Sequence, residues 1–233
     1  MNGKATGSRW SGVRLLSAAL VLFLAGMAAG GDRESSAVSG RFSASDLAHH
    51  LIAKAGTSHG LCSLLGCRDG TLALEILRGS QFFLHVQDPR STMVAAAAKV
   101  LDTNGLYGTR VLVERQPLDS LLFADNTVDL VLAVLGEGAT GQRADVSGAL
   151  ANLSIKEIVR VLRPGGRTII GTAKEAKEQL TQKQLSQWIS GGFSDQIDVK
   201  FGQDAFGSWA QITKRQPKGM GSRSRDAEKN FLK

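Results

Sequence analysis

Short apolar runs alternate with amphipathic stretches along residues 43–170. Runs with little polar interruption occupy Leu61–Leu65, Phe82–Val86 and Val128–Val134, and each has the length of a strand. Shorter runs at Arg110–Val113 and Thr168–Ile170 predict two more strands. A strand without polar alternation suits a sheet that is buried on both faces. The pattern therefore predicts an α/β fold in which helices cover a mostly parallel sheet.

Helical spacing accounts for the segments between these strands. Ser43 and Asp46 have the spacing of a capping box, and Leu47, Leu51 and Ala55 then fall on one helix face. Further helices are expected at 72–77, 93–101, 150–162 and 178–189. The helix at 150–162 is expected to end before the residues Pro-Gly-Gly at 164–166.

Two strands near the C-terminal end follow each other without a helix between them. They are predicted at Ile197–Phe201 and Trp209–Ile212. A short connection joins antiparallel rather than parallel neighbours. We therefore expect one domain over residues 43–213, with one antiparallel strand near its C-terminal end.

The composition agrees with this fold. The 233 residues include 27 Gly, 4 Pro and 6% aromatic residues, so the core must be built from small and aliphatic side chains. Cys62 and Cys67 are separated by mostly extended chain, too far for a disulfide, and are expected to be free and largely buried. His49 and His50 point about 100° apart on their helix, so no shared metal ion is expected.

The formal net charge of +7 belongs to the two ends of the chain. Residues 1–30 carry three basic and no acidic residues, and residues 214–233 carry seven basic against two acidic residues. The remaining 31–213 therefore have a net charge of −1. Because the folded core has no basic excess, no nucleic-acid partner is expected for it. Residues 214–233 are expected to form a basic tail.

The N-terminal segment has the pattern of a secretory signal peptide. Lys4, Arg9 and Arg14 precede the apolar run Leu15–Ala29, and small residues follow it. The run is shorter than the about 20 residues of a membrane span. We therefore expect a signal peptide at 1–30, a linker at 31–42, and an exported protein, periplasmic or extracellular. Membrane contact is expected only if the segment stays uncleaved.

A glycine turn between the first strand and its helix is the candidate ligand site. Residues 64–70 read Leu-Leu-Gly-Cys-Arg-Asp-Gly. In Rossmann-like folds such a turn lies at the carboxyl end of the sheet, where a cofactor approaches the backbone. Asp88 ends the second strand, where an acid can hold both hydroxyls of a ribose. Gly66, Gly70 and Asp88 are the predicted cofactor-binding residues.

Two longer segments carry a family resemblance. Residues 121–131 read Leu-Leu-Phe-Ala-Asp-Asn-Thr-Val-Asp-Leu-Val, and residues 157–167 read Glu-Ile-Val-Arg-Val-Leu-Arg-Pro-Gly-Gly-Arg. Together with the glycine turn and Val86–Pro89, they resemble class I S-adenosylmethionine-dependent methyltransferases of the type 11-like kind, over roughly residues 43–213. The resemblance implies a Rossmann-like sheet of seven strands, the last antiparallel, with S-adenosylmethionine at the ends of the first two.

The chain departs from the family's pattern at the glycine turn. The family motif places an acid at the position of Leu64 and a glycine at that of Arg68. Arg68 brings a cation toward a ligand whose sulfonium is also positive. The acid that contacts adenine in the family would fall near Pro117, with Asp119 close by. The resemblance therefore carries over only the three predicted cofactor-binding residues and gives no catalytic residue.

Two functions from different classes fit these observations. An enzyme would transfer a methyl group by aligning the cofactor with an unknown acceptor, and Glu137 is either a group that positions the acceptor or a solvated loop acid. A non-catalytic module would keep the fold without a working site, as the missing acid, Arg68 and the expected export favour. The segments at 60–62, 65–70 and 105–108 also resemble the methyltransferase-like domain that precedes a pyrroloquinoline-quinone-type β-propeller in some exported bacterial proteins.

Overall fold

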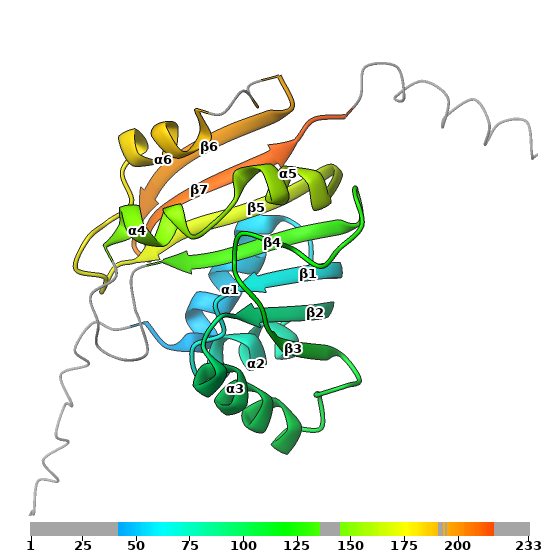
Figure 1. Cartoon of the computed structure of the whole chain (residues 1–233). Helices are drawn as coiled ribbons and strands as arrows, with labels where there is room; N and C mark the ends of the chain where they lie inside the picture. The colour runs from blue at the N-terminus through cyan, green and yellow to red at the C-terminus, as the bar shows by residue number, and fades with distance from the viewer. Residues whose placement is uncertain (1–41, 136–144, 191–192, 194, 217–233) are drawn as a thin grey trace, which may run out of the picture. The chain divides into compact units, whose positions relative to one another are not determined.

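The computed structural model describes residues 42–135, 145–190, 193 and 195–216. They form a seven-stranded sheet with the strand order β3-β2-β1-β4-β5-β7-β6 (Figure 1). The strands are β1 (His59–Leu65), β2 (Gln81–Asp88), β3 (Val111–Arg115), β4 (Val128–Leu135), β5 (Leu162–Ala173), β6 (Ile197–Asp204) and β7 (Gly207–Lys214). The helices are α1 (Ala44–Ala55), α2 (Thr71–Arg78), α3 (Ser91–Thr103), α4 (Val146–Ala151), α5 (Ile155–Val161) and α6 (Gln182–Ile189).

The strand directions agree with those expected from the sequence. Strands β1 to β5 run parallel to one another. Strand β7 is antiparallel to both β5 and β6. The predicted α/β fold, with one antiparallel strand near the C-terminal end, is therefore confirmed.

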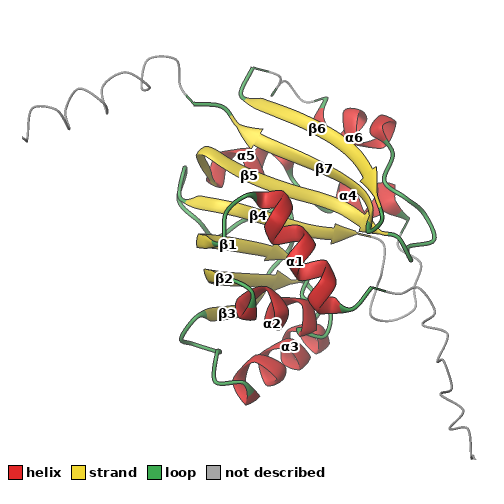
Figure 2. Ribbon diagram, turned by 180° about the vertical axis from the view of Figure 1, so that it is seen from behind, coloured by secondary structure: helices red, strands yellow, loops and turns green. Residues whose placement is uncertain are grey.

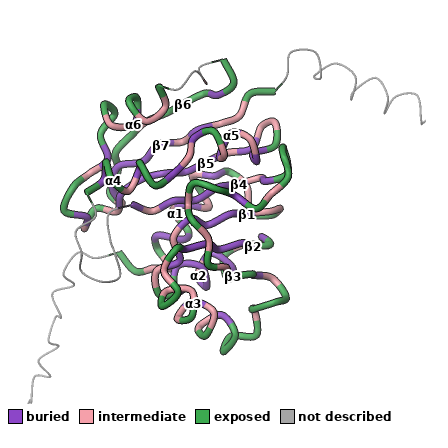
Figure 3. The backbone as a smooth tube through the Cα atoms, viewed as in Figure 1, coloured by how far each residue is buried: buried purple, intermediate pink, exposed green. Residues whose placement is uncertain are grey.

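Helices cover the sheet on both faces. Helices α1, α2 and α3 lie on one face, as Figure 2 shows, and α4, α5 and α6 lie on the other. Strand β4 contributes Leu130 and Leu132 to the core under α1–α3, and Val131 and Ala133 to the core under α4–α6. This burial on both faces explains why the strand is an uninterrupted apolar run in the sequence. Figure 3 colours the buried residues of the sheet purple.

The two long motifs of the sequence contact each other. Arg160 of α5 donates hydrogen bonds to the backbone carbonyls of Leu121 and Phe123 and pairs with the carboxylates of Asp125 and Glu157. The Glu157 carboxylate also accepts from the Leu121 amide at 3.3 Å. These bonds fix the segment that leads into β4, so the motifs act together to place this central strand.

Helix α1 begins as the sequence predicts. Ser43 is its N-cap, and the reciprocal bonds between Ser43 and Asp46 form the expected capping box. The helix ends at Gly56, whose φ of 63° is left-handed. The buried residues Leu47, Leu51 and Ala55 face the sheet, so the cap and the apolar face agree.

The single helix expected at 150–162 is wrong in its bounds. The chain forms α4 and α5 instead, because Asn152 ends the first and the Ser154 hydroxyl caps the second by accepting from the Glu157 amide. Strand β5 also begins earlier than expected, at Leu162. The residues Pro-Gly-Gly at 164–166 therefore lie within the first part of β5 rather than between helix and strand.

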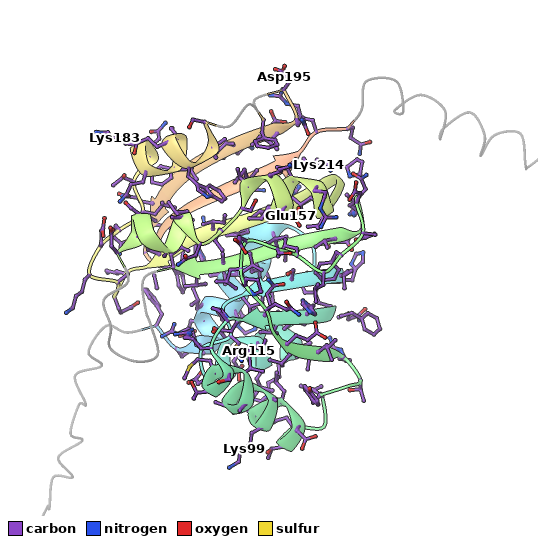
Figure 4. The ribbon with its side chains drawn as sticks, in the orientation of Figure 1. Lys99, Arg115, Glu157, Lys183, Asp195 and Lys214 are labelled. Carbon is purple, nitrogen blue, oxygen red and sulfur yellow. The ribbon has the colours of Figure 1, made fainter. Side chains whose placement is uncertain are left out.

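Charged side chains of both signs lie on the outer surface of the described residues. Lys99 on α3, Lys183 on α6 and Asp195 before β6 are exposed and point outward (Figure 4).

Among the described residues, none of the helices is long and apolar enough to cross a membrane. The expected signal peptide, nearly all of the linker, most of the basic tail and Glu137 lie outside the described residues.

Candidate active site at the carboxyl ends of β1 and β2

The glycine turn lies where predicted, between β1 and α2, and its two glycines have different roles. Both are left-handed, with φ of 88° at Gly66 and 86° at Gly70. A Cβ on Gly66 would meet no atom within 4 Å, whereas one on Gly70 would lie 2.6 Å from Cα of Ala97 on α3. Gly66 therefore leaves open space above the backbone, and Gly70 lets α2 pack closely against α3.

Arg68 occupies the position where the family motif has a glycine. Its φ is 48°, a left-handed conformation that costs most side chains about 1 kcal/mol. The backbone thus has a conformation that glycine adopts readily. The half-buried side chain of Arg68 lines two pockets.

Asp88 ends β2 beside the turn, as predicted, but its carboxylate already has partners. Arg90 donates to it from its backbone amide at 2.9 Å and from its guanidinium at 2.8 Å (Nε) and 2.7 Å (Nη2). The Cys67 amide donates a further bond at 3.1 Å. Asp88 has no exposed surface. A carboxylate has about four acceptor positions, so these four bonds occupy the acid that was expected to hold a ribose.

The charge state of Asp88 follows from these bonds. Burial disfavours the ionised carboxylate, yet the hydrogen bonds and the charge of Arg90, together with the Cys67 amide, hold the pKa of Asp88 below its ordinary value. The same pair raises the pKa of Arg90. Both groups are therefore charged at neutral pH. Arg90 is not among the residues predicted for the site, although an arginine two residues after the acid is a signal for this pair.

A pocket of about 250 Å³ opens at these strand ends, and we call it the carboxyl-end pocket. Its walls come from the glycine turn, the end of β2, the end of β4 and the α4–α5 connection: Leu65, Gly66, Arg68, Asp88, Pro89, Arg90, Leu118, Ala133, Val134, Leu135, Ala149, Asn152 and Leu153. Small-molecule sites usually have volumes of roughly 300 to 1,000 Å³. In this conformation, the described residues leave a pocket slightly below that range.

The remaining candidates of the turn are apolar or unreactive. Leu64 is 1% exposed and lies in the core under α1–α3. Cys62 and Cys67 are free and buried, as expected. Burial and the nearby Asp88 carboxylate raise the pKa of the Cys67 thiol to about 12, so the nucleophilic thiolate is absent at neutral pH.

The two positions considered for an adenine-binding acid do not supply one in the pocket. The Pro117 carbonyl accepts a hydrogen bond from the Gln87 amide at 2.7 Å. Asp119 is exposed and is absent from the residues that line the carboxyl-end pocket. The described residues also contain no group of three or more His, Cys, Asp or Glu side chains that could hold a metal ion. His49 is exposed, and His50 lies 3.2 Å from Asp204.

Comparison with known proteins agrees with the fold. Residues 64–166 match the family described as "Methyltransferase domain". A putative S-adenosyl-L-methionine-dependent methyltransferase from Methanococcus maripaludis has a TM-score of 0.58 at 20% identity, over 75% of this chain and 86% of its own. Magnesium protoporphyrin IX methyltransferase from Synechocystis, solved with bound S-adenosylmethionine, has a TM-score of 0.52 at 16% identity, over 74% and 78% of the two chains.

A third structure limits what the fold implies. The cyclase SpnF has a TM-score of 0.54 at 17% identity, over 75% of this chain and 81% of its own. Comparison with curated proteins finds no match. The described residues therefore have the class I methyltransferase fold, residues 64–166 resemble a methyltransferase domain, and the reaction must be argued from the site.

Proposed function

We propose that this chain is an S-adenosylmethionine-dependent methyltransferase that holds its cofactor in the carboxyl-end pocket and transfers a methyl group to an acceptor of unknown identity. The observation that carries the proposal is the position of Asp88 beside the open backbone at Gly66. Both lie at the carboxyl ends of adjacent parallel strands, since Leu65 pairs with Gln87 in the sheet. Ligands of open α/β sheets bind at this edge.

The pocket fits the nucleoside part of the cofactor after one side-chain movement. Leu118 and Leu153 offer apolar walls for a base, and the open space at Gly66 admits a chain close to the backbone. The Arg90 side chain is 36% exposed, so it can leave Asp88 toward solvent without unfolding its surroundings. Two ribose hydroxyls would then replace the two guanidinium donors on the carboxylate.

The chain's own residues act here by binding and orientation. The cofactor, when bound, supplies an activated methyl group, so the protein need only align an acceptor and exclude water. Asp88 would fix the ribose and Gly66 would let the ligand approach the turn. A second pocket of about 290 Å³ shares Arg68 in its lining. It is also lined by Phe42, Leu72 and Glu175, and we place the acceptor there.

Calorimetric titration of the protein with S-adenosylmethionine and S-adenosylhomocysteine tests this function. We expect binding, and we expect Asp88→Ala to weaken it at least tenfold, because a hydrogen bond to a charged group is lost. Asp198→Ala is the matched control, since it removes a surface aspartate that also pairs with an arginine, Arg215. Micromolar binding that Asp88→Ala leaves unchanged would place the cofactor elsewhere.

The Asp88–Arg90 pair also favours a second candidate, a non-catalytic module that keeps only the fold. A site with a permanently occupied Asp88 and with Leu64 in place of an acid has lost two polar groups of the family motif. Absence of binding by both the wild type and Arg90→Ala would support this candidate over the enzyme. The expected export favours it too, because the cofactor is not expected outside the cytoplasm.

We also propose that residues 1–30 direct export of the protein to the periplasm or the extracellular space. The support is the order of basic, apolar and small residues in that segment. The similarity to domains that precede a pyrroloquinoline-quinone-type β-propeller is consistent with export and stays a proposal. Fractionation of cells that express the full chain tests the location.

A further inference from the structure

A third pocket lies at the opposite end of the first strands, and we call it the amino-end pocket. Its volume is about 360 Å³, within the usual range for small-molecule sites. Leu61 of β1, Phe83 of β2, Leu112 of β3 and Phe123 of the β3–β4 connection form its apolar walls. Phe83 and Asp88 are five positions apart on β2, which is about 16 Å along a strand. The amino-end pocket is therefore separate from the carboxyl-end pocket.

Two of these walls are unusually open to solvent. Phe83 is 61% exposed and Leu112 is 45% exposed, although both lie on neighbouring strands of the central sheet. Among the described residues, the chain between β3 and β4 rather than a helix crosses this part of the sheet (Figure 1). Large apolar side chains that are exposed next to each other are typical of a surface that binds a ligand or another macromolecule.

The floor of the pocket contains a buried histidine with one unpartnered nitrogen. His85 of β2 is 8% exposed and lines the pocket. Its Nε2 lies 2.9 Å from the Glu114 carboxylate on β3. Its Nδ1 is buried without a hydrogen-bond partner, and so is the hydroxyl of Ser63, its register partner on β1. Buried polar atoms without a hydrogen-bond partner are rare. Two of them on adjacent strands indicate that a bound molecule supplies the missing partner.

The Glu114 contact decides which hydrogen-bonding role Nδ1 has. A carboxylate only accepts, so Nε2 of His85 must carry the ring proton and donate it to Glu114. In neutral imidazole the other nitrogen then accepts. The guanidinium of Arg110 does not serve the pocket, because it donates to the carbonyls of Leu77, Ser80 and Phe82. For the neutral ring, the missing partner of Nδ1 is therefore a hydrogen-bond donor.

We propose that the amino-end pocket binds a small aromatic molecule that carries a hydroxyl or N–H group, which donates to Nδ1 of His85. The apolar walls take the ring, and Phe123, whose ring meets that of His85 edge-on at 5.1 Å, covers it. Glu114 is a positioning residue that fixes the tautomer of His85. The inference does not depend on cofactor binding, because it concerns the opposite end of the strands.

A matched pair of probes tests the donor requirement. 2-Naphthol and 2-methoxynaphthalene have the same ring system, but only the first can donate a hydrogen bond. Titrated into the full chain and followed by NMR, 2-naphthol should bind five- to tenfold more tightly, about the value of one hydrogen bond. It should also shift the Nδ1 resonance of His85 in histidine-labelled protein. Equal affinities, or no binding of either probe, would overturn the proposal.

Three variants locate the site. His85→Leu should abolish the preference for 2-naphthol. Leu112→Ser should lower the affinity for both probes, because it removes one apolar wall of the pocket. Val199→Ser is the matched control, because Val199 is 41% exposed on β6, the opposite edge strand. An effect of Val199→Ser as large as that of Leu112→Ser would show unspecific apolar binding. The free-protein spectrum tests the tautomer even if His85→Leu fails to fold: a proton on Nδ1 rather than Nε2 contradicts the proposal.

Discussion

Asp88 and Arg90 are two residues apart at the end of β2 and form a bidentate ion pair in the candidate active site. Asp88 has no exposed surface, whereas the Arg90 side chain is 36% exposed. The pair thus joins a buried carboxylate to a guanidinium whose side chain is partly exposed to solvent. Because breaking it would expose the acid to a ligand, the same contact that fills the site also offers a way to open it.

Acid should destabilise the protein through Asp88. The folded-state pKa of Asp88 lies below that of the unfolded chain, about 3.9, so the pair stabilises the fold above that pH and its contribution is lost as pH falls. In urea unfolding between pH 6 and pH 3, the free energy of unfolding of the wild type should fall more steeply than that of Asp88→Asn. Equal slopes would show that the carboxylate is not paired in solution.

Removing the Arg90 side chain should strengthen cofactor binding. Arg90→Ala leaves two acceptor positions of Asp88 open for ribose hydroxyls, so the dissociation constant of S-adenosylhomocysteine should fall several-fold. Arg115→Ala is the matched control, because it removes the same charge nearby. Arg115 is exposed, and its side chain donates to the Pro89 carbonyl rather than to Asp88. Weaker binding by Arg90→Ala, with a folded far-UV spectrum, would show that Arg90 itself holds the ligand.

Strand β4 provides a test of the core. Leu132 is fully buried between Leu64 of β1 and Ile169 of β5. Leu132→Asp should prevent folding, because an unpaired buried carboxylate costs several kcal/mol against a total stability of about 5 to 15 kcal/mol. Val199→Asp, at an exposed position of β6, should melt cooperatively like the wild type. Cooperative melting of Leu132→Asp would contradict the burial of this strand.

The strands and the place of the glycine turn were predictable because they depend on local patterns. The apolar run at Val128–Val134 reports burial on both faces, and the glycine turn reports a left-handed backbone. The break between α4 and α5 was missed because two caps, at Asn152 and Ser154, interrupt a helical spacing that continues through them. The occupation of Asp88 was missed because it depends on the direction of the Arg90 side chain, which a strand-end motif does not report.

Export is tested by the N-terminus of the mature protein. If residues 1–30 form a cleaved signal peptide, the mature chain should begin between about residues 29 and 32, where small residues stand at the cleavage positions. N-terminal sequencing of the protein from the producing cell measures this directly. A protein that still begins at Met1 and stays in the cytoplasm would remove the compartment argument against methyl transfer.

Arg68→Gly separates backbone strain from charge in the glycine turn. Glycine adopts a φ of 48° without the cost that a side chain has, so the variant should be more stable to urea by about 1 kcal/mol. Arg68 lines the carboxyl-end pocket, so its loss also removes a positive charge near a bound cofactor. Binding of the cationic S-adenosylmethionine should then improve more than that of S-adenosylhomocysteine, whose sulfur is neutral.

Arg68→Lys is the matched control, because it keeps both the charge and the Cβ. It should therefore raise neither the stability to urea nor the affinity for S-adenosylmethionine. An equal gain for both ligands would assign the effect to space rather than to charge, and a less stable Arg68→Gly would show that the contacts of the side chain outweigh the cost of its backbone conformation.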